Sequence, residues 1–246
     1  EGVEQDYALA VEWYQKAIEG GNIDAMNNLA YCYELGQGVE QDTARAIEWY
    51  QRAADAGYAE AMNNLGFAYE YGNGVEQNSA QAVEWYRRAV DAGSIEAMNN
   101  LGFVYEHGLG VEQDYEQAVE WYRRAADAGS DSAMLNLGVC YDFGRGVEQD
   151  SAQAVEWYRN AIDAGNVAAM VNLAYCYEYG RGVEQDMAQA LEWYEKAADA
   201  GNADAMNNLG YCYFSGHGVE QDYAQAMEWY QRAVDAGSTA AMTNLG

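Results

Sequence analysis

A unit of 36 residues recurs along the whole 246-residue chain. Each copy opens with Gly-Val-Glu-Gln, and the opening glycines are Gly2, Gly38, Gly74, Gly110, Gly146, Gly182 and Gly218. A fixed period of this length is typical of repeat proteins, in which each unit packs on its neighbours only. A catalytic group is needed once, whereas every motif here is present in six or seven copies. The pattern therefore predicts an architecture and not a singular active site.

Two segments of each repeat have the periodicity of amphipathic helices. Asp42 is placed to cap a helix that runs to about Ala56, where Gly57 supplies the left-handed conformation that ends it. The next segment carries a core-facing stripe in which the glycine indicates close helix approach: Ala61, Met62, Leu65, Gly66 and Tyr69. The short turn between the two segments makes the helices antiparallel neighbours.

These helices predict an all-α fold, a solenoid of antiparallel helix hairpins in one domain spanning residues 1–246. The register predicts a lone second helix over residues 1–20, six hairpins over about 21–237 and a partial first helix over 238–246. Apolar surface at the two ends, from Trp13, Tyr14, Met242 and Leu245, would then lack a covering repeat. We expect the ends to be complementary, so that molecules stack head to tail.

The surface of the second helices combines charge with tryptophan. Acid and base alternate at i, i+4 spacing, which predicts helix-supporting ion pairs: Glu12–Lys16, Glu48–Arg52, Glu84–Arg88, Glu120–Arg124, Glu192–Lys196 and Glu228–Arg232. The tryptophans, from Trp13 to Trp229, recur at one position of the repeat. This regularity predicts packing between hairpins and not a ligand site.

Four cysteines fall at a single repeat position: Cys32, Cys140, Cys176 and Cys212. Packed helices lie roughly 8–10 Å apart, whereas the Cα atoms of a disulfide lie within about 7 Å. We therefore predict free thiols that fill the core. Free thiols weakly favour a reducing compartment, and nothing else in the sequence indicates one.

Forty acidic and twelve basic residues give a formal charge of −28. This charge opposes binding to nucleic acid, which requires neutralised phosphates, and favours a partner of basic character. Solubility alone is the alternative explanation. No stretch approaches the roughly 20 apolar residues of a membrane span, so membrane insertion is not expected.

The repeat reads Ala-Met-x-Asn-Leu-Gly-x-x-Tyr-Glu-x-Gly-x-Gly-Val-x-x-Asp, followed by Ala-x-Glu-Trp-Tyr-x-x-Ala-Ala-x-x-Gly. This motif resembles the Sel1-like repeat over essentially the whole chain. The Gly-x-Gly-Val loop and the 36-residue period separate it from the tetratricopeptide repeat. The resemblance implies a tetratricopeptide-like, right-handed α–α superhelix with a concave groove, and a scaffold or adaptor that assembles other proteins. The near identity of the copies leaves open a structural, consensus-like or designed array with no specific ligand.

In related hairpin repeats the first helix lines the groove, so its residues that point away from the core stripe are the candidate ligand site. Amides would bond a peptide backbone, aromatics would hold side chains and acids would pair with basic residues. The candidates are Asn63, Asn99, Asn207, Tyr31, Phe67, Phe103, Tyr175, Tyr211, Glu70, Glu106, Tyr71 and Tyr179. These columns vary between copies, which fits a binding surface but also fits an unconstrained one.

One further asparagine is invariant, as at Asn64 and Asn100, and we expect it to bond a neighbouring backbone carbonyl or loop. Zinc-protease, Cys-x-x-Cys and phosphate-loop motifs are absent from the sequence, and the two histidines, His107 and His217, lie in different copies. The sequence thus predicts no enzyme, no cofactor and no metal. It predicts a module that binds a basic or mixed peptide segment.

Overall fold

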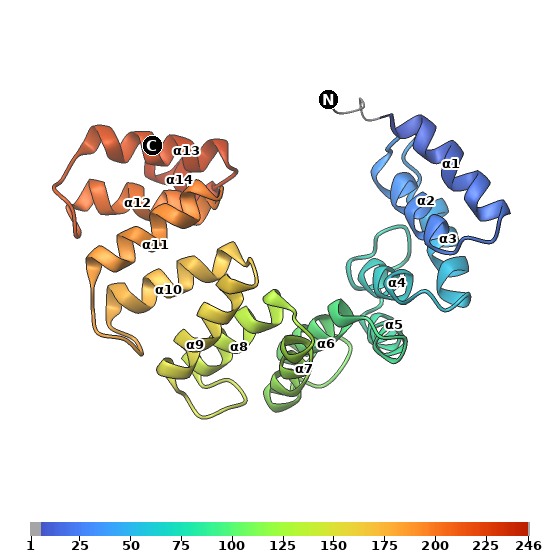
Figure 1. Cartoon of the computed structure of the whole chain (residues 1–246), viewed down its shortest axis with the longest axis horizontal. Helices are drawn as coiled ribbons and strands as arrows, with labels where there is room; N and C mark the ends of the chain where they lie inside the picture. The colour runs from blue at the N-terminus through green and yellow to red at the C-terminus, as the bar shows by residue number, and fades with distance from the viewer. Residues whose placement is uncertain (1–5, 246) are drawn as a thin grey trace. The chain divides into compact units, whose positions relative to one another are not determined.

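The computed structural model describes residues 6–245, and within them the chain forms 14 α-helices and no strand (Figure 1). Gly2 and the ends of the predicted ranges, residues 1–5 and 246, lie outside the described residues. The all-helical fold predicted from the repeat is confirmed, with consecutive helices packed pairwise within each of the two units described below. No described helix combines the length and the apolar character that a membrane span requires.

The helices divide between two compact units, with a boundary between Arg124 and Ala125. The N-terminal unit contains α1 (Tyr7–Glu19), α2 (Asp24–Leu35), α3 (Thr43–Asp55), α4 (Ala59–Tyr71), α5 (Ser79–Asp91) and α6 (Ile95–His107). Helix α7 (Tyr115–Asp127) contains the boundary. The C-terminal unit contains α8 (Asp131–Phe143), α9 (Ser151–Asp163), α10 (Val167–Tyr179), α11 (Met187–Asp199), α12 (Ala203–Ser215), α13 (Tyr223–Asp235) and α14 (Thr239–Leu245).

Local signals set the helix ends as predicted. The Asp42 side chain accepts a hydrogen bond of 3.0 Å from the Arg45 amide and caps α3. After α3, Gly57 has a φ of 93°, which L-residues with a side chain rarely adopt. In the Gly-x-Gly loop, a Cβ at Gly74 would lie 2.6 Å from the carbonyl oxygen of Thr43, so the loop lies directly against the start of α3.

The hairpin core is built around one tyrosine of each second helix. Tyr86, in α5, is fully buried, and a Cβ at Gly66 of α4 would lie 2.5 Å from its ring. The small residue predicted from the sequence is therefore required where α4 and α5 cross. The cysteines fill the same core as free, buried thiols, as predicted. Burial raises the pKa of Cys176 and of Cys212 to about 12, so both are protonated at neutral pH.

The tryptophans pack against the hairpin cores, with the exception of Trp13, which is 60% exposed. The predicted ion-pair ladder is mostly wrong. Among the six predicted pairs, all within residues 6–245, only Glu192–Lys196 lies within ion-pair distance, at 2.8 Å. The basic residues instead lie over the tryptophan three positions earlier, as Arg88 does at 4.0 Å from the centre of the Trp85 ring. A cation over an aromatic ring is stabilised more than a cation in a solvent-exposed ion pair, and the arginines therefore lie over the tryptophans.

Candidate functional site

The predicted aromatic candidates lie on the first helices, and most are exposed. In the N-terminal unit, Tyr31, Phe67 and Tyr71 are 51%, 45% and 53% exposed, and Phe103 is half-buried. We call these four residues the N-terminal aromatic face. The rings of Phe67 and Tyr71 lie 4.4 Å apart, one helical turn from each other on α4.

The C-terminal unit has an equivalent surface of three tyrosines. Tyr175 and Tyr179 stack with ring centres 6.2 Å apart on α10, and Tyr211 of α12 is 54% exposed. We call Tyr175, Tyr179 and Tyr211 the C-terminal aromatic face. Each face leaves large aromatic side chains in contact with water, as the sequence predicted.

The two acidic candidates are not on this surface, and the expectation that they point away from the core is wrong. Glu70 and Glu106 are buried. Glu70 accepts a hydrogen bond of 2.7 Å from the Tyr86 hydroxyl, and Glu106 accepts one of 2.8 Å from Tyr122. A buried phenol requires an acceptor, and the glutamate of the facing helix supplies it. Burial, and to a smaller extent the hydrogen bond to Glu70, raises the pKa of Tyr86 far above its usual range.

The carboxylate position is constant in the N-terminal unit and varies in the C-terminal unit. Asp142 is one methylene shorter, and it pairs instead with Arg181 at 2.8 Å while accepting a hydrogen bond of 3.2 Å from Ser151. Arg181 is the middle residue of the Gly-x-Gly loop in the following repeat. His217 occupies the same loop position and has its Nε2 3.6 Å from Glu178. The sequence signal for these contacts is the single variable residue inside an otherwise constant loop.

Asparagines link successive repeats. Asn100 Nδ2 donates to Asn63 Oδ1 at 2.9 Å, and Asn244 Nδ2 donates to Asn207 Oδ1 at 2.9 Å. The expectation that the invariant asparagine bonds a backbone carbonyl or a loop is wrong for these copies, because its partner is the side-chain amide of the preceding repeat. The candidates Asn63 and Asn207 therefore have a structural role, and Asn99 is also engaged.

The Oδ1 atoms of Asn63 and Asn207 are occupied, but their Nδ2 groups have no acceptor among the described residues. The hydrogen bond to Oδ1 fixes the orientation of each amide and leaves its second polar group as a donor. Both side chains are half-buried and lie on the helices that carry the aromatic faces. Each thus offers one oriented donor to a carbonyl group.

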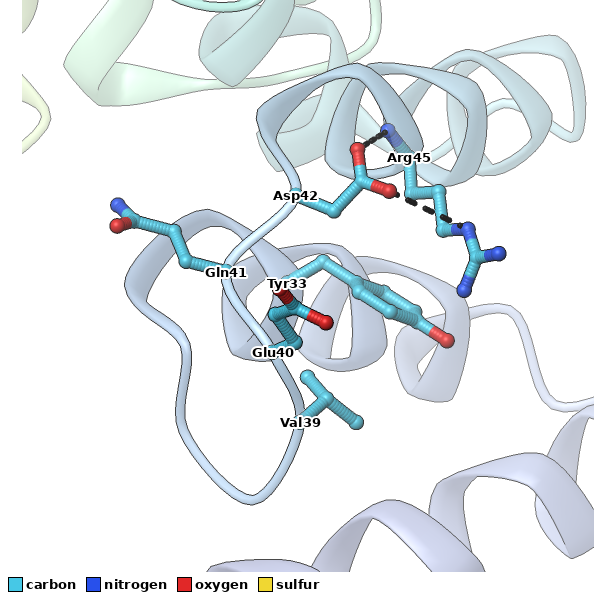
Figure 2. A pocket seen from close by; sticks show the side chains of 6 residues that line it. All are labelled: Tyr33, Val39, Glu40, Gln41, Asp42 and Arg45. Atoms are coloured by element: carbon cyan, nitrogen blue, oxygen red, sulfur yellow. Dashed lines mark hydrogen bonds and ion pairs between the residues drawn. The ribbon is translucent and has the colours of Figure 1, made fainter.

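Two similar hollows lie beside the loops that join first and second helices. One, of about 400 Å³, is lined by Tyr33, Val39, Glu40, Gln41, Asp42 and Arg45 (Figure 2). Arg45 fills part of it: Nε lies 3.3 Å from Asp42 Oδ2, and the guanidinium carbon lies 5.6 Å from the centre of the Tyr33 ring. The other, of about 450 Å³, is lined by Tyr213, Val219, Glu220, Gln221, Asp222 and Gln225. Sequence reasoning missed both, since they depend on side chains turned out from the loop.

Helix hairpins that are closed by a tyrosine–glycine contact and joined by asparagine bonds within each unit define an α-helical repeat protein. The Sel1 repeat model matches residues 1–22, 23–58, 59–94, 95–130, 131–166, 167–202 and 203–238. The chain belongs to the Sel1 repeat family. Sel1 repeats are non-catalytic scaffolds that generally mediate interactions between proteins.

Solved structures agree with this assignment. A Sel1 repeat protein from Oxalobacter formigenes is 36% identical, with 94% of each chain covered and a TM-score of 0.86. A protective antigen of uropathogenic Escherichia coli, displaying an SLR fold, is 38% identical with a TM-score of 0.72. The alignment covers all of this chain but 53% of the antigen, so this chain spans about half of that protein. An immunity protein from Pseudomonas aeruginosa, 22% identical over 87% of this chain and 81% of its own, shares the fold with a TM-score of 0.62. No curated protein matches the chain.

Proposed function

We propose that this chain is a non-enzymatic protein-interaction module, and that its aromatic faces bind an extended peptide segment of basic or mixed charge. The observation that carries the proposal is the combination, on the same helices, of exposed aromatic rings with the Nδ2 donors of Asn63 and Asn207, which have no acceptor in the part of the chain that the structure describes. Aromatic side chains supply large contact areas at low entropic cost, and oriented amides bond peptide carbonyls.

Charge supports a partner with basic residues. The net charge of −28 raises the rate of encounter with cationic segments and opposes nucleic acid. Glu70 and Glu106 cannot pair with basic residues of a ligand as the sequence predicted, because they are buried and already accept hydrogen bonds from tyrosines. In the proposal, the acidic surface steers the partner, and the aromatic faces hold it.

A peptide array with basic, mixed and acidic sequences tests the proposal, followed by affinity measurements on the peptides that bind. Tyr71→Ala and Tyr179→Ala remove one exposed ring from each face. Loss of an aromatic anchor is expected to weaken binding by about 30-fold, the effect of an interface residue worth about 2 kcal/mol. The matched control is Tyr223→Ala, which removes a 58% exposed ring from a second helix, α13.

Two outcomes would contradict the proposal. In one, the captured peptides bind the Tyr71→Ala, Tyr179→Ala double variant as tightly as the parent. In the other, acidic peptides bind as well as basic ones.

The competing proposal is a structural array that has no specific ligand and stacks head to tail. The observation in its favour is that Trp13 and Met242, on the first and last described helices, are 60% and 53% exposed. Light scattering over a concentration series separates the two proposals. A mass that grows with concentration, together with an empty peptide array, would favour the stacked array.

A further inference from the structure

The tyrosine that lines each hollow recurs in every complete first helix, and in several repeats an arginine of the same chain reaches it. Two different positions supply this arginine, either the start of the following second helix or the preceding second helix. The contacts are Arg45 over the Tyr33 ring at 5.6 Å, Arg87 Nη2 to the Tyr105 hydroxyl at 2.9 Å, and Arg159 Nη2 to the Tyr177 hydroxyl at 3.0 Å. This register therefore accepts a guanidinium group repeatedly.

The copy at Tyr213 has no arginine at either position. Gln225 stands where the first hollow has Arg45, and Glu195 stands where the neighbouring repeat has Arg159. The hollow beside Tyr213 is of similar size, about 450 Å³ against about 400 Å³. Glu220 and Asp222 line it, so its surroundings are acidic.

The polar group that holds the arginine in the first hollow is also present here. Asp222 Oδ1 caps α13 by accepting hydrogen bonds from the amides of Ala224 and Gln225, at 2.9 and 3.0 Å. Its Oδ2 has no partner among the described residues. In the first hollow, the equivalent oxygen is Asp42 Oδ2, which lies 3.3 Å from Arg45 Nε (Figure 2). The Tyr213 ring and Asp222 Oδ2 therefore line the same hollow without the arginine that the first hollow contains.

We propose that the hollow beside Tyr213 binds the guanidinium group of an arginine from a partner protein. The partner's arginine would lie against the Tyr213 ring and pair with Asp222 Oδ2, as Arg45 does within the first hollow. A planar guanidinium stacks on an aromatic ring and presents several donors, whereas a lysine ammonium is a strongly hydrated point charge. Glu195 and Glu220 add charge of the sign that attracts it. This inference goes beyond the proposed function, because it uses none of the residues of the aromatic faces.

The Tyr69 copy shows why charge distinguishes Tyr213. Tyr69 also lacks an arginine at both positions, where the chain has Gln51 and Gln81. Gln51 is neutral, and its amide donates to Asp55 on its own helix at 2.9 Å. Only the Tyr213 copy puts a carboxylate, that of Glu195, at the position from which an arginine reaches the tyrosine hydroxyl in other repeats.

A titration of the full chain with N-acetylarginine methylamide tests the proposal. The ring resonances of the tyrosines are followed by NMR, and Tyr213→Phe assigns the signal of interest. We expect a saturable shift of the Tyr213 signal. Gln225→Arg reproduces the first hollow and fills the site from within, so the affinity should fall by about tenfold. N-acetyllysine methylamide should bind more weakly than the arginine probe.

The reverse change provides the matched control. Arg45→Gln combined with Gln15→Glu gives the first hollow the residues of the Tyr213 copy, and the Tyr33 signal should then begin to respond to the arginine probe. Positions 15, 45 and 225 are exposed, so these variants should keep the melting temperature of the parent. If Gln225→Arg fails to fold, Glu195→Arg supplies a guanidinium from the preceding helix, as Arg159 does for Tyr177. The proposal is overturned if the filled variant binds like the parent, if the Arg45→Gln, Gln15→Glu variant gains no response, or if lysine binds equally well.

Discussion

The two compact units use the same repeat but differ in how constant their inter-helix contacts are. In the N-terminal unit, asparagine pairs join consecutive first helices, from Asn64 to Asn27 at 3.1 Å and from Asn100 to Asn63 at 2.9 Å. In the C-terminal unit, Leu135 and Val171 replace two of the acceptors. Asn208 consequently donates to the hydroxyl of Tyr175 at 3.0 Å. Both units thus have a side-chain hydrogen bond between successive first helices, but its acceptor is an asparagine oxygen in one unit and a tyrosine hydroxyl in the other.

The buried carboxylates differ in the same way. Every complete hairpin of the N-terminal unit has a tyrosine–glutamate bond, as in Tyr50–Glu34 and Tyr86–Glu70, both 2.7 Å. The C-terminal unit keeps this bond once, in Tyr194–Glu178 at 2.6 Å, and replaces it with Asp142–Arg181 and with Phe214. Variation therefore concentrates in the C-terminal unit, which also contains the open hollow at Tyr213.

The largest effect is expected from alkaline pH, which acts on the buried tyrosines of both units. Burial raises the folded-state pKa of Tyr50, Tyr86, Tyr158 and Tyr194 above the ordinary value. The unfolded chain releases these protons near pH 10, while the folded chain retains them, so stability is complete below about pH 10 and falls above it. Above pH 10, each of these tyrosines should lower the free energy of unfolding by about 1.4 kcal/mol per pH unit. Chemical denaturation followed at pH 9, 10 and 11 measures the loss, and an unchanged midpoint would contradict it.

Arg181→Ala breaks the contact that is specific to the C-terminal unit. The side chain of Asp142 is 6% exposed and would lose its cation. Removing one partner of a buried pair should cost about 3 kcal/mol, the lower end of the usual range because Arg181 itself is partly exposed. Urea denaturation measures this change. Asp142→Asn in the same chain should restore most of the loss, and a double variant as unstable as Arg181→Ala would refute the explanation.

Replacing tyrosine by phenylalanine compares a bonded hydroxyl with an unbonded one. Tyr86→Phe leaves Glu70 buried without its donor and should cost about 1–2 kcal/mol. Tyr230→Phe is the control, because Phe214 stands at its carboxylate position and offers no acceptor. This second change should be close to neutral. Equal losses of unfolding free energy in the two variants would show that the glutamate bond contributes nothing specific.

Asn63→Leu gives the N-terminal unit the residue that the C-terminal unit has at position 135. Asn100 would lose its acceptor, and the expected cost is about 1 kcal/mol, since Asn100 is only half-buried. Hydrogen exchange in α4 and α6 measures the local change. Asn160→Leu, at an exposed position of the second helix α9 and outside the asparagine pairs, is the control and should have little effect.

The sequence predicts those features that depend on one repeat or on a short stretch of backbone. The cap at Asp42, the helix end at Gly57 and the close approach at Gly66 follow from local geometry, and the structure confirms all three. The exposure of Tyr71 and Tyr179 also follows from helical periodicity. Whether these rings bind a ligand stays a prediction.

The inward turn of Glu70 could not be read from helical periodicity. Position 70 lies at the edge between the buried and exposed sides of α4, and its direction depends on a phenol 16 residues away across the hairpin. The asparagine pairs depend on the stacking of repeats, since their partners lie 37 residues apart, one more than the period. The ion pairs predicted on second helices failed because the tryptophan rings compete for the same cations.

The Gly-x-Gly loop limits which segments of the chain can be duplicated or transplanted without loss of a contact. In two copies its middle residue lies near the carboxylate of the preceding hairpin, since Arg181 pairs with Asp142 and His217 has its Nε2 3.6 Å from Glu178. Duplication or transplantation of the hairpin that carries Asp142, without the loop that carries Arg181, would therefore separate a buried carboxylate from its cation. The segment that can be moved without breaking this contact is one hairpin together with the Gly-x-Gly loop of the next repeat. Such a segment is longer than one 36-residue repeat.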